Sequence, residues 1–121
     1  MKILIVDDDP ATLLVSSLAL ENSGDFEVFQ AKGGSEAVEL ARKFLPEVIL
    51  MDLVMNDLDG QEVLQILRSE RATENIPVIF HSARNEVFAS GQWSRLGAKG
   101  FIRKPSNPLS LPAEVRRLMG Q

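Results

Sequence analysis

The sequence predicts an α/β fold in which helices cover both faces of a five-stranded parallel sheet. Five short runs rich in β-branched and other apolar residues alternate with longer segments of helical periodicity, which is typical of strand–helix units. The runs are apolar almost without interruption, so both faces of each strand are expected to be buried. We place the strands at residues 2–7, 26–31, 47–52, 76–81 and 99–103.

Helices are predicted between these strands, and two begin at clear signals. The first follows Asp9-Pro10, because aspartate is a good N-cap and proline is favoured at the first helical position. Its apolar residues Leu14 and Leu18 are expected in the core. The third follows Asp59-Gly60, and a fourth is expected at roughly residues 85–96. Core stripes in the other helices are Ala37, Ala41, Phe44 and Leu45, then Val63, Leu64 and Leu67, and finally Leu111, Val115, Leu118 and Met119.

Length and composition predict a single globular domain over residues 1–121, since hydrophobic residues make up 45% and charged residues 25%. The net charge of −4 argues against direct binding of nucleic acid, because a phosphate backbone favours surfaces dense in Lys and Arg. The absence of cysteine excludes disulfides, thiolate zinc sites and thiol catalysis. The short apolar N-terminus runs into three aspartates, unlike a signal peptide, so we expect a cytoplasmic protein with no membrane attachment.

Polar side chains stand at the ends of four of the predicted strands. Asp7 and Asp8 follow the first strand, Asp52 the third, Ser82 the fourth and Lys104 the fifth. In a doubly wound sheet, ligands bind outside the carboxyl ends of the strands. Each residue alone could be an ordinary turn former or helix cap. Together they predict a site with three carboxylates, a hydroxyl and an ammonium, which suits a divalent cation and a phosphoryl group.

The chemistry of such a site follows from its residue types. Three neighbouring carboxylates repel one another and favour a hard cation that takes oxygen ligands, such as magnesium. An aspartate carboxylate can also accept a phosphoryl group covalently, and nearby cations assist that transfer by neutralising the phosphoryl oxygens. Lys104 is expected to provide a cation of this kind.

Over essentially its whole length, the chain resembles the receiver domain of response regulators in two-component signalling. The segments that carry the resemblance are Ile3–Asp9, Val48–Met55, Asp59-Gly60, Ser82-Ala83 and Gly97–Pro105. The resemblance implies a flavodoxin-like, doubly wound (βα)5 fold with strand order 2-1-3-4-5. It also implies that the Lys104-Pro105 peptide bond is cis. Asn56 and Ser106 depart from the family pattern, which commonly has proline and an apolar residue at these positions.

The resemblance also implies roles for the acidic residues. Asp52 becomes the phosphoacceptor. The implied cofactor is Mg2+ (or Mn2+), held by Asp8, Asp52 and the Val54 backbone carbonyl directly and by Asp7 through a water molecule.

The resemblance implies that Ser82 and Lys104 bind the phosphoryl oxygens, and that Ser82 and Phe101 switch conformation. Receiver domains draw the hydroxyl residue toward the phosphoryl group, and the aromatic residue turns inward. The alternative for Phe101 is a strand side chain that is permanently buried. His81, the only histidine, is given no role.

By resemblance, the function is that of a phosphorylation-dependent switch in a phosphorelay, which assists its own phosphorylation and dephosphorylation but is not a turnover enzyme. The implied partners are a sensor histidine kinase or phosphotransfer protein, and an output domain or downstream protein. Receivers often bind partners or form homodimers through the fourth helix, fifth strand and fifth helix. Trp93 is our candidate for such a contact, although it could equally pack on its own core.

Two other functions fit the residues less well, and one alternative remains open. Asp7-Asp8-Asp9 contains the Asp-x-Asp pair of haloacid-dehalogenase-like phosphatases, but there is no cap domain. A calcium loop at Asp57–Gly60 fails, because Met55 and Ile66 would occupy ligand positions. The remaining alternative is a pseudo-receiver, a protein-interaction module that keeps the fold without using phosphorylation.

Overall fold

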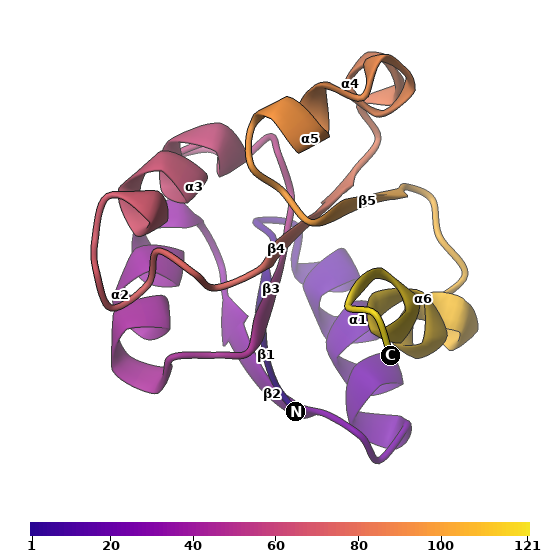
Figure 1. The fold of residues 1–121 in the computed structure, drawn as a ribbon. Coiled ribbons are helices and arrows are strands. Elements are labelled where there is room, and N and C mark those ends of the chain that lie inside the picture. The colour runs from indigo at the N-terminus through magenta and orange to yellow at the C-terminus, as the bar shows by residue number, and fades with distance from the viewer.

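The computed structural model describes residues 1–121 and contains one five-stranded parallel sheet (Figure 1). The strands lie in the order β2-β1-β3-β4-β5, and every neighbouring pair is parallel. Each strand boundary lies within two residues of its predicted position, and the predicted fold and strand order are confirmed. The strands are β1 (Lys2–Val6), β2 (Glu27–Ala31), β3 (Val48–Met51), β4 (Val78–Ser82) and β5 (Gly100–Arg103).

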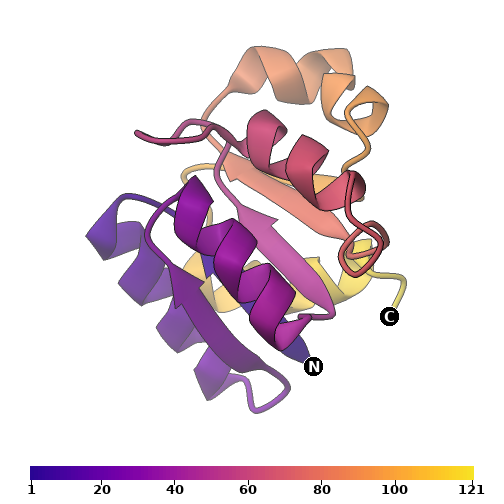
Figure 2. The ribbon, with the colours of Figure 1, turned by 90° about the vertical axis from the view of Figure 1, so that its left-hand side faces the viewer.

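Helices cover both faces of the sheet. Figure 2 looks onto the face covered by α2 and α3, and α1 and α6 lie on the opposite face. None of the helices has the length and apolar character needed to span a membrane. The helices are α1 (Pro10–Asn22), α2 (Gly34–Phe44), α3 (Gly60–Arg68), α4 (Asn85–Ser90), α5 (Gln92–Arg95) and α6 (Leu111–Leu118), with a short 3-10 turn, η1 (Pro108–Ser110), before α6.

Alternation along the strands divides the core into two clusters. In β1, Leu4 and Val6 join the cluster under α2 and α3, whereas Ile3 and Ile5 join the cluster under α1 and α6. Successive strand side chains point to opposite faces, so a strand with every residue buried must be covered on both sides. All four residues of β3 are buried, as the uninterrupted apolar run predicts.

The predicted burial of Leu14 and Leu18 is wrong, because these side chains are 56% and 47% exposed. The face of α1 that contacts the sheet instead carries Leu13, Leu20 and two small polar residues, Ser16 and Ser17. Apolar side chains occur on both faces of this helix, so spacing alone could not tell which face packs on the sheet. Leu45 is also exposed. It ends α2 in a left-handed conformation with φ 47°, which takes it out of the helical stripe.

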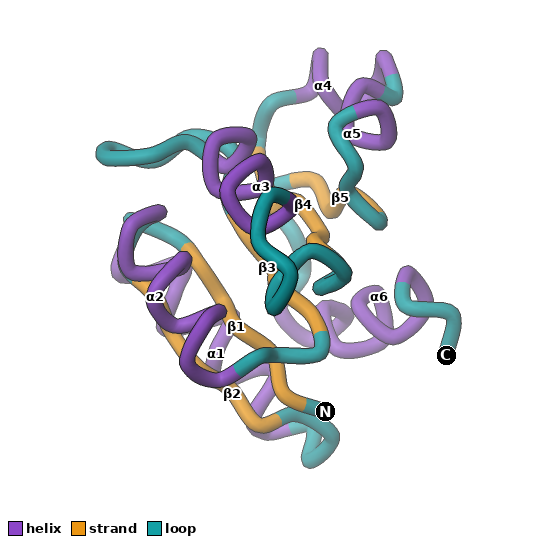
Figure 3. The backbone as a smooth tube through the Cα atoms, turned by 60° about the vertical axis from the view of Figure 1, so that its left-hand side comes forward, coloured by secondary structure: helices purple, strands orange, loops and turns teal.

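The single helix predicted at 85–96 is also wrong, since the segment forms two short helices, α4 and α5 (Figure 3). Gly91 separates them with a left-handed φ of 69°, and its N–H donates to the Phe88 carbonyl oxygen. A left-handed residue cannot continue a right-handed helix, and glycine adopts this conformation at little cost.

Candidate functional site

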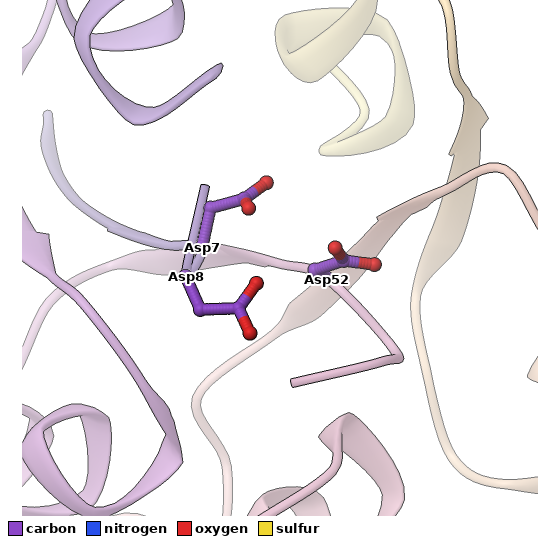
Figure 4. Close-up of side chains that lie close together, drawn as sticks. All are labelled: Asp7, Asp8 and Asp52. Carbon is purple, nitrogen blue, oxygen red and sulfur yellow. The ribbon is translucent and has the colours of Figure 1, made fainter. Parts of the chain in front are cut away.

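Strand pairing brings the predicted acidic residues to one edge of the sheet. Val6 of β1 is paired with Met51 of β3, so Asp7 and Asp52 leave the sheet side by side. The Asp52 N–H donates to the Val6 carbonyl oxygen at 3.1 Å, which extends the pairing into the site. Figure 4 shows Asp7 and Asp8 extending from the end of β1 beside Asp52, and carboxylate oxygens of all three lie within 4.8 Å of one another.

Lys104 joins this acidic cluster from the end of β5. Its backbone N–H donates to the Ser82 carbonyl oxygen at 2.9 Å. Lys104 directly follows Arg103, the last residue of β5 that is paired with β4. Its Nζ donates to Asp7 Oδ2 at 2.7 Å and to Asp52 Oδ2 at 3.0 Å. Burial alone would lower the pKa of Lys104, but the hydrogen bonds from its ammonium to Asp7 and Asp52 outweigh burial and raise this pKa. Lys104 is therefore charged at neutral pH.

Each carboxylate also accepts a backbone hydrogen bond from its own loop or from a neighbouring one. Asp7 Oδ1 accepts from Asp9, and Asp52 Oδ1 accepts from Val54 at 3.3 Å. Asp8 Oδ2 accepts from the N–H of Asn56 at 3.0 Å. Proline, which is common in the family at this last position, has no N–H to donate. Asn56 therefore gives the loop after β3 a direct bond to Asp8.

The donor set fits a magnesium ion. Three carboxylates against one ammonium leave a formal excess of two negative charges, and every donor at the cluster is an oxygen atom. A small hard cation with oxygen ligands matches both features. Asp7 is almost fully buried, whereas Asp8 and Asp52 are half-buried, so solvent reaches the latter two carboxylates.

The close approach of α3 depends on Gly60, the first residue of that helix. A Cβ atom at this position would lie 2.6 Å from the Asp52 carbonyl oxygen and 3.0 Å from the Leu53 Cα. Glycine thus lets the first turn of α3 pass directly beside the strand end that presents Asp52. Asp59 caps the helix by accepting from Glu62 N–H, and the Glu62 side chain accepts from Asp59 N–H in return.

Ser82, Phe101 and Trp93 form no side-chain hydrogen bond with this cluster. Ser82 is buried at the end of β4, where its Oγ accepts from Arg84 N–H at 3.3 Å. Phe101 is 6% exposed, and its ring makes edge contacts with Phe80 and Phe88 at centroid distances of 6.5 and 5.5 Å. Trp93 on α5 is half-buried against the core. The peptide bond after Lys104 is cis, as the resemblance implies.

Sequence reasoning missed the role of Asp57, which joins the loop after β3 to the start of α2. Its carboxylate accepts from the N–H groups of Gly34 and Ser35, both at 2.9 Å. These backbone hydrogen bonds hold the pKa of Asp57 well below its usual range. The sequence contains one relevant signal: α2 begins at Gly33-Gly34, which has no side chain to cap the helix, so a cap from elsewhere could have been sought.

We expect Asp57→Ala to lower the free energy of unfolding by about 0.5–1 kcal/mol, at the low end for a lost cap because the carboxylate is solvated. A lowered pKa in the folded state means that this stabilisation is complete above pH 4 or so, the pKa of an unfolded aspartate, and is lost as pH falls toward the folded-state pKa. The difference between wild type and variant should therefore shrink in acid. Urea unfolding at several pH values measures it, with the exposed Glu74→Ala as control. A difference that does not change with pH would contradict the assignment.

Comparisons with known proteins agree with this geometry. The family model described as "Response regulator receiver domain" matches residues 3–116. The chain is 34% identical over its full length to response regulator Rre1 of Synechocystis, of which it spans 52%. It is 36% identical over 98% of its length to Protein PilH of Pseudomonas aeruginosa, of which it spans 97%. Like Rre1, the regulators RpaA of Synechocystis and PhoP of Bacillus subtilis are about twice as long as the region that the chain matches, which spans 48% of each.

Solved structures lead to the same result. A response regulator from Desulfuromonas acetoxidans superposes with a TM-score of 0.86 and 31% sequence identity, covering 98% of this chain and 96% of that one. The family match, the strand order and the acidic cluster at the carboxyl edge of the sheet are therefore consistent with one another. The chain belongs to the response regulator receiver domain family of two-component signalling.

Proposed function

We propose that this chain is a phosphorylation-dependent switch in which Asp52 accepts a phosphoryl group from a sensor histidine kinase or a phosphotransfer protein. The observation that carries the proposal is the position of the Asp52 carboxylate, which lies next to two other carboxylates and 3.0 Å from the Lys104 ammonium. The family assignment supports the general function, because its members are signalling proteins rather than turnover enzymes.

In the proposed transfer, an Asp52 carboxylate oxygen attacks the phosphorus atom of a phosphohistidine. The new P–O bond forms as the P–N bond breaks, and the electron pair of that bond returns to the imidazole nitrogen. Negative charge is spread over the three phosphoryl oxygens during this step, so positioned cations contribute most of the assistance. Lys104 already contacts Asp52 Oδ2 and can turn its ammonium to those oxygens with little movement.

The proposed metal ligands are Asp8, Asp52 and the Val54 backbone carbonyl, with Asp7 binding through a water molecule. The excess of negative charge at these carboxylates and their mutual distances support this set. When bound, Mg2+ (or Mn2+) supplies charge neutralisation of the phosphoryl oxygens. Asp7 contributes in another way as well, because its hydrogen bond at 2.7 Å holds the Lys104 ammonium at the site.

We propose that phosphorylation is read out through Ser82 and Phe101. A phosphoryl group at Asp52 would draw the Ser82 hydroxyl, and Phe101 lies on the strand paired with the one that Ser82 ends. The Phe101 ring contacts Phe88 of α4, which is 38% exposed, so any change at Phe101 alters the surface of α4. The proposed partner surface comprises α4, β5 and the last helix, α6, with Trp93 of α5 beside it. Its partner would be an output domain, a downstream protein or a second copy of this chain.

The first experiment is to incubate the protein with a small acyl phosphate, with and without Mg2+, and to measure its intact mass. We expect a gain of one phosphoryl group that requires the metal, and we expect Asp8→Asn, which removes a proposed metal ligand, to lose most of the label even when Mg2+ is present. Asp8 contributes its carboxylate to the cluster and accepts one hydrogen bond, from Asn56 N–H, which the amide oxygen of asparagine can also accept. A folded wild type that gains no mass would instead support a phosphorylation-independent module.

A further inference from the structure

The loop that follows Lys104 has few bonds to the rest of the protein. Beyond Lys104, no residue of the segment 105–107 pairs its backbone with a strand. The hydrogen bonds of Asn107 are local, to Leu109 and Ser110. One bond joins this segment to the sheet: Ser106 Oγ lies 3.0 Å from Nε2 of His81, the residue before Ser82 on β4.

His81 is well suited to hold this loop. It is 4% exposed, and burial is the main reason why its pKa falls to about 4, with the nearby Lys104 charge adding to the effect. The ring is therefore neutral at neutral pH and has one donor and one acceptor nitrogen. A serine hydroxyl can donate or accept, so the bond to Ser106 is available to either tautomer.

Side-chain packing does not substitute for the bond between His81 and Ser106 in holding the loop. A cavity of about 460 Å³ lies between α1, the end of β4 and the loop, and its walls include Val15, Leu111 and both His81 and Ser106. An apolar side chain at position 106 could fill part of this space and anchor the loop by burial, but serine is too small to do so. The backbone bond from Lys104 N–H to the Ser82 carbonyl oxygen thus ties the start of the loop to the sheet, and the bond between His81 and Ser106 is the hydrogen bond that ties residues 105–107 to it.

We propose that His81 and Ser106 are positioning residues whose hydrogen bond fixes the backbone after Lys104 and so holds the Lys104 ammonium between Asp7 and Asp52. The lysine side chain is a flexible stem, so the position of its ammonium depends on where its backbone is held: by the N–H bond to Ser82 on one side of the residue and by the loop on the other. It bonds carboxylates that follow two different strands, β1 and β3, and a shift of the loop lengthens at least one of these contacts. This inference rests on the proposed role of Asp52 as phosphoacceptor.

The test compares Ser106→Ala, His81→Leu and the double variant with wild type. We expect each single variant to slow phosphorylation by an acyl phosphate by about fivefold to tenfold, a fraction of the roughly 100-fold that a 1 Å misplacement can cause. Because both changes break the same bond, the double variant should be no slower than either single variant. His81→Gln, whose amide nitrogen can take the place of Nε2, should recover most of the rate.

The matched control is Ser110→Ala, since this serine lies in the same connection but bonds only within it, to the Asn107 carbonyl oxygen. It should react at the wild-type rate. A second readout is the backbone NMR order parameter of residues 104–107, which should fall in Ser106→Ala and stay unchanged in Ser110→Ala.

The outcomes separate this inference from the proposed function. A wild type that is not phosphorylated would contradict the function of Asp52, while the order parameters would still decide whether the bond holds the loop. A wild type that reacts, with Ser106→Ala reacting at the same rate and its loop equally ordered, would overturn the inference. So would effects of the single variants that simply add in the double variant. If His81→Leu does not fold, Ser106→Ala and His81→Gln still give a decision.

Discussion

Asp52→Asn is expected to reduce phosphorylation of the chain to below detection. The substitution keeps the shape of the side chain but replaces a charged carboxylate by a neutral amide, which is a much weaker nucleophile and cannot form an acyl phosphate. None of the other carboxylates combines the position of Asp52 with its contact to Lys104, because Asp7 is almost fully buried and Asp8 has no bond to the ammonium. Intact mass, measured under conditions that preserve acyl phosphates, gives the result directly.

The matched control for this variant is Asp9→Asn. Asp9 is the next aspartate after the cluster and caps α1 through bonds to Ala11 and Thr12. Asparagine caps helices as well as aspartate does, so the fold should be unaffected and the label should form as in wild type. A phosphoryl group that persists on Asp52→Asn would place the acceptor at another residue and contradict the proposed function.

The second large effect is expected for Lys104→Met, which should lower the free energy of unfolding by about 2–3 kcal/mol when no divalent cation is present. Methionine keeps the length of the side chain but leaves Asp7 without its cationic partner, and the Asp7 side chain is only 3% exposed. Breaking a buried ion pair typically costs about 3–5 kcal/mol, and the smaller figure allows for the solvent that reaches Lys104 and Asp52.

Metal and pH should both change the difference in free energy of unfolding between wild type and Lys104→Met. Adding Mg2+ should narrow the stability difference between wild type and Lys104→Met, because the variant then regains a cation at the half-buried carboxylates of Asp8 and Asp52. The raised pKa of Lys104 means that its contribution is fully present below pH 10 or so, the pKa of an unfolded lysine, and is lost as pH rises through the higher folded-state pKa. Urea unfolding in a chelator and in excess Mg2+ measures these effects, with the exposed Lys99→Met as control. Equal stabilities of wild type and Lys104→Met in the chelator would show that the pair does not stabilise the fold.

Much of the fold could be predicted from local pattern. The uninterrupted apolar run Val48–Met51 indicated a strand buried on both faces, and Asp9-Pro10 and Asp59-Gly60 indicated helix starts that the structure confirms. Local pattern could not predict the structure where a segment had two conformations or two packing faces of similar energy. Leu14 and Leu18 have suitable spacing for a core stripe, but α1 packs through Leu13 and Leu20 instead. Gly91 could have been tolerated within a helix, and here it ends one.

The sequence by itself determined the parallel sheet and the acidic, hydroxyl and lysine residues at the strand ends, because these depend on apolar runs and on the residue that follows each run. Only the tertiary structure decided the contacts between residues far apart in the chain. The bond between His81 and Ser106, the cap that Asp57 provides for α2 and the position of Lys104 between Asp7 and Asp52 all depend on which strands become neighbours. Strand order is set by the packing of the whole core, and residues distant in sequence acquire a fixed separation only when that core has formed.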